Sequence, residues 1–344
     1  VLEEYKNSNI AIPLSGGPDS NAIAYVVRNF KKTKFYIIYV EGTDDERYLI
    51  KSVVKKFKLN HQFVDWKKHY SLETVDEMIK ILGEPFKVPQ SLYQFSLKKE
   101  AAAEKTELLL YGEGADGIFG GSYKKALPFY LIDHLINFRF ISFIKFYLKF
   151  KPHNFKEDIK FLKRIISLLI FWIFKRQKYP YNTRKFEELI NDDVKNKLLQ
   201  KDNQKYKIDN SLFKPFKSHL IARLIVEPSA YQVNIDYHLN KFLNINSRYL
   251  YYDKKIAEIG LSSHISQFFE DFQNKSLWRK SLKNKIADEI FEEKKKLVRP
   301  SNNKDFYMKI ILPFWKSNEF QRFVKNYTKK TFFRIINEIP KNDI

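Results

Sequence analysis

Two short glycine-rich runs hold the residue types in this chain that are best suited to chemistry. The first reads LSGGPDS at residues 14–20, and the second reads YGEGADGIFGG at residues 111–121. Nine of the ten glycines in the sequence precede residue 122. Because glycine permits positive φ and a close approach of the backbone, these runs predict two turns built around something small.

The first run has the composition of a phosphate-binding turn. A strand that ends in Gly16 and Gly17 and opens into a helix presents free backbone N–H groups and a positive dipole end to phosphate. The hydroxyls of Ser15 and Ser20 add donors, and Pro18 suits a first helical turn. The run is not a Walker A loop, because no Gly-Lys-Ser/Thr follows the glycines.

Asp19 is the unexpected member of this run. A carboxylate beside phosphate is repulsive unless a cation lies between them, so Asp19 is predicted to be a Mg²⁺ ligand. The alternative is a plain helix cap with tight-turn glycines. That alternative explains any two residues of the run but not all six.

The elements that position these runs follow from apolar patterning. Apolar stretches at residues 9–14, 34–40, 61–66 and 107–111 predict strands, and helical patterns separate them. Such alternation implies βαβ units and a mainly parallel sheet. Both glycine-rich runs follow strands, and ligands of parallel sheets bind beyond the carboxyl ends of the strands. The chain beyond residue 125 is aromatic, basic and helical, with one candidate linker at residues 178–185.

Bulk composition excludes several classes of protein. The chain has 344 residues and no cysteine, which excludes a disulfide framework, a thiolate metal site and a cysteine nucleophile and suits a cytoplasmic protein. The apolar run Ile165–Phe174 is about half of the ~20 residues that span a bilayer, so we expect a buried helix and no transmembrane segment. The start VLEEYKNSNI lacks the pattern of a signal peptide. It also lacks an initiator methionine, which leaves upstream residues open.

The net charge of +22 lies entirely in the second part of the chain. Residues 1–121 hold 17 Lys and Arg against 17 Asp and Glu, whereas residues 122–344 hold 45 against 23. Such asymmetry can mark a nucleic-acid or membrane surface. The abundance of Lys, Asn, Phe and Ile favours a solvated, lysine-rich helical surface instead.

Two further groups of residues are candidates for a function. The stretch INFRFISFIKFYLKF at residues 136–150 either packs its aromatic side chains into the core, which the helical spacing favours, or lies on a membrane surface. The histidines show no metal-like pair spacing and are predicted to be structural or surface residues: His61, His69, His134, His153, His219, His238 and His264.

Four segments together resemble a known family. SGGPDS matches the SGGxDS loop of the N-type ATP pyrophosphatases, and YGEGADGIFGG resembles the GEGxDExFGGY signature of their asparagine synthetase branch. Residues 246–261 resemble the segment that contains ExRxPFLD, with Arg248 and Asp253 retained. Residues 275–296 resemble the segment that supplies a catalytic lysine. The four segments occur in the family's order and cover nearly the whole chain.

The resemblance implies both a fold and an activity. The fold is α/β, with a parallel five-stranded sheet of adenine nucleotide α-hydrolase (Rossmann-like) type and a largely helical C-terminal part. Residues 1–125 would form the ATP pyrophosphatase core, and residues 126–344 would complete the synthetase domain. Family members use ATP and Mg²⁺ to adenylate a carboxylate, release pyrophosphate, and let ammonia or an amine attack. β-Lactam synthetases and lasso-peptide cyclases use an amine of the substrate itself.

The resemblance also implies roles for individual residues. The phosphates would be held by Ser15, Gly16, Gly17, Asp19 and Ser20. The adenine and ribose pocket would be lined by Leu14, Ile38, Tyr111 and Gly112. Mg²⁺ would be bound by Asp19 and Asp116, one from each glycine-rich turn.

Two catalytic side chains are implied in the same way. Glu113 occupies the position of the proton-accepting glutamate, or alternatively caps the helix that follows. Lys295 is the candidate for the lysine that stabilises developing charge in acyl transfer. Lys294 and Lys296 are adjacent alternatives, and a plain lysine run on a solvated helix face is the other interpretation.

Several positions depart from the asparagine synthetase pattern. Gly117 replaces the acidic residue after the motif's aspartate, Asn246 replaces the glutamate of ExRxPFLD, and Leu250 and Tyr251 replace Pro-Phe. Glu293 stands where an arginine is usual. The half of the pattern that meets ATP is thus intact, and the half that meets the carboxylate differs. Adenylation is therefore better supported than aspartate as the acceptor.

The sequence leaves the nitrogen source open. These residues contain no glutaminase domain, so nitrogen would come from free ammonia, an upstream domain, a separate glutaminase partner, or a substrate amine. Two other functions are compatible with parts of this pattern. An RNA-modifying ATP pyrophosphatase would share SGGPDS, but the GEGADGIFGG run and the lack of cysteine argue against a nucleic-acid partner. A catalytically silent relative is the third hypothesis.

Overall fold

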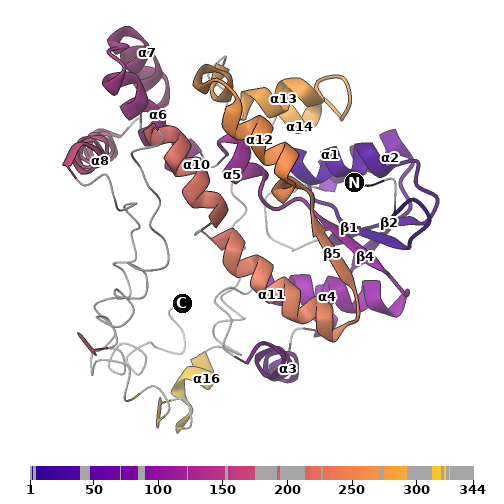
Figure 1. The fold of residues 1–344 in the computed structure, drawn as a ribbon. Helices are drawn as coiled ribbons and strands as arrows, with labels where there is room; N and C mark the ends of the chain where they lie inside the picture. Colours follow the sequence, from indigo (N-terminus) through magenta and orange to yellow (C-terminus); the bar gives the residue numbers. More distant parts are fainter. Residues whose placement is uncertain are drawn as a thin grey trace.

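The computed structural model contains a parallel sheet of five strands, on the right in Figure 1. The structure describes residues 2, 5–38, 47–69, 71–83, 90–121, 123–151, 154–174, 192–193, 214–225, 228–270, 275–292, 312–318, 321–322 and 325. In spatial order the strands are β3 (His61–Val64), β2 (Thr33–Ile38), β1 (Ile10–Pro13), β4 (Leu108–Tyr111) and β5 (Asn246–Tyr249). The predicted α/β class with a five-stranded parallel sheet is confirmed.

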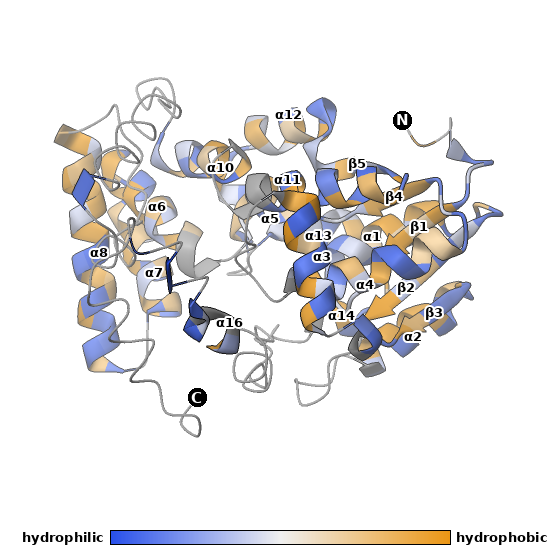
Figure 2. Cartoon of the chain, turned by 90° about the horizontal axis from the view of Figure 1, so that it is seen from below, coloured by the Kyte–Doolittle hydropathy of each residue, from blue (hydrophilic) through white to orange (hydrophobic). Residues whose placement is uncertain are grey.

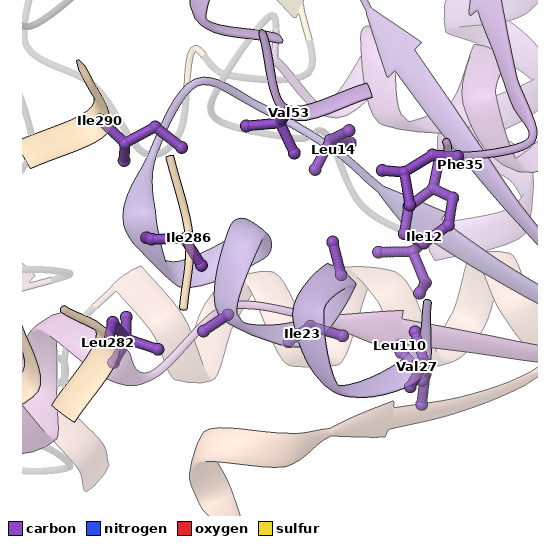
Figure 3. Close-up of a cluster of buried hydrophobic side chains, with 14 of the residues drawn as sticks. Ile12, Leu14, Ile23, Val27, Phe35, Val53, Leu110, Leu282, Ile286 and Ile290 are labelled. Carbon is purple, nitrogen blue, oxygen red and sulfur yellow. The ribbon is translucent and has the colours of Figure 1, made fainter. Parts of the chain in front are cut away.

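Helices cover both faces of the sheet. The helices between successive strands up to β4 are α1 (Pro18–Val27), α2 (Arg47–Phe57), the short 3₁₀-helix η2 (Trp66–His69), α3 (Leu72–Leu82) and α4 (Gln90–Ala103). Successive strand residues point to opposite faces. On one face Ile12, Phe35 and Leu110 pack with side chains of α1 and α2 (Figure 3). On the other face Tyr36 and Leu109 pack with side chains of α4. Burial on both faces explains the nearly continuous apolar runs of the strands.

The fifth strand comes from a distant part of the chain. β5 follows α11 (Pro228–Phe242) and pairs with β4, with Asn246 opposite Leu108 and Tyr249 opposite Tyr111. Its residues are exposed or partly buried at the sheet edge, so they form no apolar run that would have predicted a strand. The 3₁₀-helix η3 (Leu250–Tyr252) and α12 (Lys254–Ser262) come next. The segment resembling ExRxPFLD therefore completes the sheet.

A second core lies among the helices beyond β4. Its elements are α6 (Tyr123–Ile136), α7 (Phe140–Phe150), α8 (Phe155–Phe174), α10 (Pro215–Ile225) and η4 (Ile265–Phe268). The large buried side chains at its centre are Tyr130, Phe216, Phe268 and Phe269. The short helix α5 (Ala115–Phe119) precedes these elements and packs in the first core. In both views α7 and α8 lie at the end of the molecule opposite the sheet (Figures 1 and 2).

The helix predicted at Ile165–Phe174 exists, but the expectation that it is buried is largely wrong. Within α8, Ile165 and Trp172 are buried, whereas Ile166, Ile170 and Phe174 are at least half exposed. The helix packs on α6 along one face only. No helix in the described part of the chain is long and apolar enough to cross a membrane.

Two C-terminal elements return to the first core, α13 (Ser276–Leu282) and α14 (Glu289–Glu292). The short helix α16 (Leu312–Lys316) follows later in the chain. Leu282, Ile286 and Ile290 belong to the same buried cluster as Ile23 of α1 and Val53 of α2 (Figure 3). This packing brings the chain around residue 275 to the turn between β1 and α1. The candidate linker at residues 178–185 lies outside the described residues.

Candidate active site

The turn between β1 and α1 is held by its own side chains. Gly17 is the N-cap of α1, and Pro18 begins the helix. The hydroxyls of Ser15 and Ser20 lie 3.1 Å apart, and Ser20 Oγ also accepts a hydrogen bond from the Ser15 N–H at 3.1 Å. The Gly17 N–H donates to Ser15 Oγ at 3.2 Å. Both serine hydroxyls, predicted as phosphate donors, therefore also fix the shape of the turn.

Asn21 is a structural residue of this turn that the sequence analysis missed. Its buried amide donates to the carbonyl oxygens of Ser15 at 2.9 Å and Gly17 at 2.7 Å. The Gly17 carbonyl also accepts a hydrogen bond from the Asn21 N–H at 3.4 Å. Asn21 therefore ties both carbonyls to the start of α1 and fixes the shape of the turn. Its place one turn beyond Gly17 was the available signal.

The second glycine-rich run forms a turn that touches the first. Gly114 is the N-cap of α5 with φ of 100°, and a Cβ there would lie 3.0 Å from Cε2 of Tyr252. Both facts require glycine at this position. A Cβ on Gly112 would lie 3.3 Å from the backbone nitrogen of Ser20. The two turns are thus in near contact at the carboxyl ends of neighbouring strands, as the resemblance implied.

Asp19 and Asp116 converge on one ammonium group, that of Lys275. Lys275 Nζ lies 2.9 Å from Asp19 Oδ1 and 2.7 Å from Oδ2, and it also pairs with Asp116 Oδ1. The lysine side chain is only 7% exposed. Burial opposes its charge, but the two carboxylates outweigh burial and raise the pKa of the Lys275 amine. The two predicted metal ligands therefore do meet at a cation.

Lys275 was not predicted, although it is the first residue of the segment that resembles the catalytic-lysine segment. It precedes α13 in a left-handed conformation with φ of 56°. Gly121 makes room for it, because a Cβ there would lie 2.0 Å from Asp116 Oδ1 and 2.5 Å from Lys275 Cε. The final glycine of the second run thus permits the ion pair.

The donor set fits Mg²⁺. The Lys275 ammonium shows that Asp19 and Asp116 can approach one positive charge together, and both offer the hard oxygen ligands that Mg²⁺ prefers. The described residues contain no cluster of three or more His, Asp or Glu side chains suited to a metal. Mg²⁺ at this place would therefore need phosphate oxygens and water to complete its shell, which is its usual mode in nucleotide sites.

Glu113 lies just beyond the end of β4, near a buried ion pair that Lys98 forms with Asp236. Burial and the nearby Asp236 raise the pKa of the Glu113 carboxyl to about 7, and Lys98 opposes that shift. The alternative that Glu113 caps the next helix is wrong, because Gly114 is the N-cap and no side chain bonds there. A carboxyl with this pKa can accept a proton near neutral pH.

The buried pair beneath Glu113 is Lys98 of α4 with Asp236 of α11. Neither side chain is exposed. Asp236 also accepts hydrogen bonds from the Tyr249 hydroxyl at 2.9 Å and from Gln232 Nε2 at 3.1 Å. The Tyr249 ring stacks on Tyr111 with centroids 4.9 Å apart. Sequence reasoning did not find this network, because its members lie on two helices and two strands far apart in the chain.

The four residues assigned to an adenine and ribose pocket all lie at the carboxyl ends of strands. However, the side chains of Leu14 and Tyr111 point to opposite faces of the sheet, into separate clusters. The Tyr111 hydroxyl lies 3.5 Å from the Asn240 side chain. The structure therefore does not bring these two side chains together. Gly112 offers only backbone at the contact of the two turns, and Ile38 ends β2.

Two departures from the family pattern have structural reasons. A Cβ on Gly117 would lie 3.2 Å from Leu224 Cδ2 of α10, so Leu224 occupies the space that an acidic side chain would need. Tyr251 donates a hydrogen bond from its hydroxyl to the backbone oxygen of Asp19 at 2.9 Å. The tyrosine that replaces the motif's phenylalanine thus helps to hold the first turn. Asp253 caps α12 by accepting from the Lys255 N–H.

The last candidates from the sequence are the C-terminal lysine run and the histidines. Lys295, its neighbours Lys294 and Lys296, and Glu293 lie outside the described residues. Among the histidines, His134 and His219 are buried against aromatic rings, His134 against Tyr130 and His219 against Phe129. Burial lowers the pKa of His134 to about 4. Both are structural, as expected.

Comparison with known proteins agrees with the geometry. Residues 6–311 match the family model described as asparagine synthase. No curated protein gives a significant match. The matched range includes both glycine-rich turns, β5 and Lys275, so it covers every residue of the site described above.

Proposed function

This chain belongs to the asparagine synthase family, a family of ATP-dependent amide-forming ligases, and we propose that it adenylates a carboxylate and passes the acyl group to nitrogen. The acid is aspartate or a related carboxylate. The products of the first step are an acyl-adenylate and pyrophosphate, and the second step yields an amide and AMP.

The observation that supports this proposal most directly is the meeting of Asp19 and Asp116 on one cation. Two carboxylates repel each other, so their convergence on one buried cation indicates that this place is built to hold positive charge beside negative groups. Mg²⁺ bound by this pair would neutralise the triphosphate and the leaving pyrophosphate. The N–H groups at the start of α1 add a second favourable field for phosphate.

In the first step the substrate carboxylate oxygen attacks the α-phosphorus of ATP, and the bond to the bridging oxygen of pyrophosphate breaks. The β1–α1 turn binds the phosphates through Ser15, Gly16, Gly17 and Ser20. Lys275 Nζ lies 2.7 Å from Asp19 Oδ2. From there the lysine is well placed to turn from Asp19 toward the departing pyrophosphate and to neutralise its negative charge.

In the second step nitrogen attacks the acyl carbon, and the bond from that carbon to the phosphate oxygen of AMP breaks. The attacking nitrogen must lose a proton, and Glu113 accepts it. Its pKa of about 7 makes it a stronger base than an ordinary glutamate while leaving it largely ionised above neutral pH. Lys295 remains the candidate for stabilising the developing oxyanion. The nitrogen comes from ammonia, from a separate or upstream glutaminase, or from a substrate amine.

Isotope exchange between pyrophosphate and ATP tests the proposal. The protein is incubated with Mg²⁺, labelled pyrophosphate and one carboxylic acid at a time, beginning with aspartate. Acid-dependent exchange is expected, and Asp19→Asn should lower it on the order of 100-fold through the lost metal ligand. Asp76→Asn, at an exposed aspartate of α3, is the matched control and should retain full exchange.

The Lys275 ammonium also favours a second candidate, a catalytically silent family member. In that case the lysine would remain between Asp19 and Asp116 and keep Mg²⁺ out. Equilibrium binding of ATP with and without Mg²⁺ separates the two candidates. Mg²⁺-independent ATP binding combined with no exchange for any acid would favour the silent protein over the ligase.

A further inference from the structure

The outer face of α7 is an apolar stripe exposed to solvent. No residue of this helix is buried, and Ile141 is 84% exposed. Ile144 and Leu148 follow at intervals of three and four residues, so they lie on the same face as Ile141, and both are more than half exposed. The expectation that this stretch packs into the core is therefore correct for one face only.

The neighbouring helix α8 repeats the arrangement. Ile159, Ile166, Ile170 and Ile173 form a stripe along it at helical spacing, and all are exposed. Phe174, at the end of the helix, is 77% exposed. Single exposed apolar side chains are ordinary, but contiguous stripes on adjacent helices mark an interaction surface.

Both helices are nevertheless fixed firmly to the protein by their opposite faces. Phe146 of α7 meets the Tyr130 ring of α6 edge-on, with centroids 5.0 Å apart. Tyr147 stacks on Phe161 of α8 at 6.2 Å. Phe143, Phe150, Leu168 and Leu169 complete this inner layer. The outer stripes therefore lie on two helices whose inner faces pack against each other and against α6.

The charge around the stripes is strongly positive. Residues 138–174 contain two acidic residues, Glu157 and Asp158, and Asp158 is already engaged by Tyr147 and Lys151. The same range contains eight basic residues: Arg139, Lys145, Lys149, Lys151, Lys156, Lys160, Lys163 and Arg164. An apolar face flanked by lysine and arginine is the composition of helices that lie in the interface of an anionic membrane.

We propose that α7 and α8 together form a docking surface for an anionic lipid bilayer. Their isoleucine, leucine and phenylalanine side chains enter the boundary between headgroups and acyl chains, and the flanking lysines and arginines contact lipid phosphates. Charge decides between this occupant and a second copy of the chain, because two such faces in contact would bring their positive charges together. The inference goes beyond the proposed ligase activity and does not rest on it.

The position of the surface leaves the active site free. The helices α7 and α8 lie at one end of the molecule and the sheet lies at the other (Figures 1 and 2). No described helix is long and apolar enough to span a membrane.

Cosedimentation of the full chain with vesicles tests the proposal, without ATP. One vesicle preparation contains phosphatidylcholine with phosphatidylglycerol, and the other contains phosphatidylcholine alone. Binding to the anionic vesicles is expected, and the double variant Ile141→Ser/Ile144→Ser should weaken it by roughly tenfold or more through lost apolar contact. Lys160→Glu/Lys163→Glu should also weaken it, and added salt should do the same.

Ile259→Ser is the matched control, because Ile259 of α12 is as exposed as Ile144 but lies on another helix. It should bind vesicles like the wild type, and circular dichroism should show every variant folded. The proposal is overturned if the chain ignores anionic vesicles at low salt, or if the isoleucine variants bind unchanged. It is also overturned if Ile141 and Ile144 instead hold a dimer, measured by sedimentation velocity without lipid.

Discussion

Lys275 donates two hydrogen bonds to the carboxylate of Asp19, 2.9 Å to Oδ1 and 2.7 Å to Oδ2. The same ammonium pairs with Asp116 from the second turn. One lysine therefore ties the start of α13 to both glycine-rich turns. Before any metal binds, it holds two carboxylates together that would otherwise repel each other. On metal binding, Lys275 must share these carboxylates or turn toward the phosphates.

Replacing Lys275 by methionine should destabilise the metal-free protein. The change leaves Asp19 and Asp116 close together without a counter-ion. We expect a loss of about 2 kcal/mol, below the 3–5 kcal/mol of a fully buried pair because Asp116 is half exposed. Urea unfolding in the presence of a chelator measures it.

Lys280→Met is the control for this experiment, since Lys280 pairs with Glu270 in the solvent. Its effect should stay within about 0.5 kcal/mol. Mg²⁺ with ATP should restore part of the stability lost in Lys275→Met. Equal losses in the two variants would mean that the Lys275 contacts are not important for stability.

Glu113→Gln should separate activity from stability. The folded protein raises the pKa of this carboxyl from 4.5 to about 7, so ionised Glu113 opposes folding. That effect is absent below pH 4.5 and grows as the pH rises to 7. Above pH 7 the variant should be more stable than the wild type by at least about 1 kcal/mol. Near pH 4 the two should unfold alike.

The same substitution should lower amide formation on the order of 100-fold, because the base is lost. In the wild type the rate of the nitrogen-transfer step should fall as the pH drops through 7, since protonated Glu113 cannot accept a proton. Pyrophosphate exchange should change far less, because it precedes nitrogen attack. A variant that loses both reactions equally would place Glu113 outside this role.

Lys98 and Asp236 should behave as one unit. Lys98→Met or Asp236→Asn alone leaves a buried group without its partner and should cost about 3 kcal/mol in each case. The double variant should cost clearly less than the sum of the two losses. Urea unfolding of all four proteins completes the cycle, and simple additivity would contradict the pairing.

The pair should also tune Glu113. Asp236 raises the pKa of Glu113 and Lys98 lowers it. The pH profile of nitrogen transfer should therefore move to lower pH in Asp236→Asn and to higher pH in Lys98→Met. A merely structural pair would lower the rate without moving the profile.

Gly121→Ala should damage the site more than the fold. The new Cβ would overlap the ends of two flexible side chains, Asp116 and Lys275, and these can move aside at small cost. The moved carboxylate would weaken Mg²⁺-dependent ATP binding by roughly tenfold. Gly83→Ala makes the converse control: nothing lies within 4 Å of its Cβ, but φ is 72°. It should lose about 1 kcal/mol of stability and keep full ATP binding.

The sequence predicted those parts of the structure that depend on residues adjacent in the chain, namely strands and tight turns. Four strands follow from apolar runs, and both turns follow from the two runs that end in glycine; the structure has all of them. The pairing of Asp19 with Asp116 came from the family resemblance, and it agrees with two turns that follow strands of one parallel sheet. The resemblance added the fifth strand's existence but not its location.

The rest depends on contacts between distant segments. Lys275 is one of 62 lysines and arginines, and the segment that it begins contains several other lysines, so its place there does not single it out. Its role appears only when Leu282, Ile286 and Ile290 pack on α1. Asp236 is equally unmarked, since only the folded chain places it beside Lys98. The expectation that Ile165–Phe174 is buried was largely wrong, because apolar composition alone does not distinguish side chains that face the core from apolar side chains on the opposite, exposed face of the helix.

The late position of β5 in the chain has a consequence for biosynthesis. β4 is buried on both faces and pairs with β5 along one edge, yet residues 246–249 leave the ribosome long after β4. During that interval β4 exposes a bare apolar edge, the kind that recruits strands from other chains. A nascent chain stalled before residue 246 should therefore depend on a chaperone to remain monomeric.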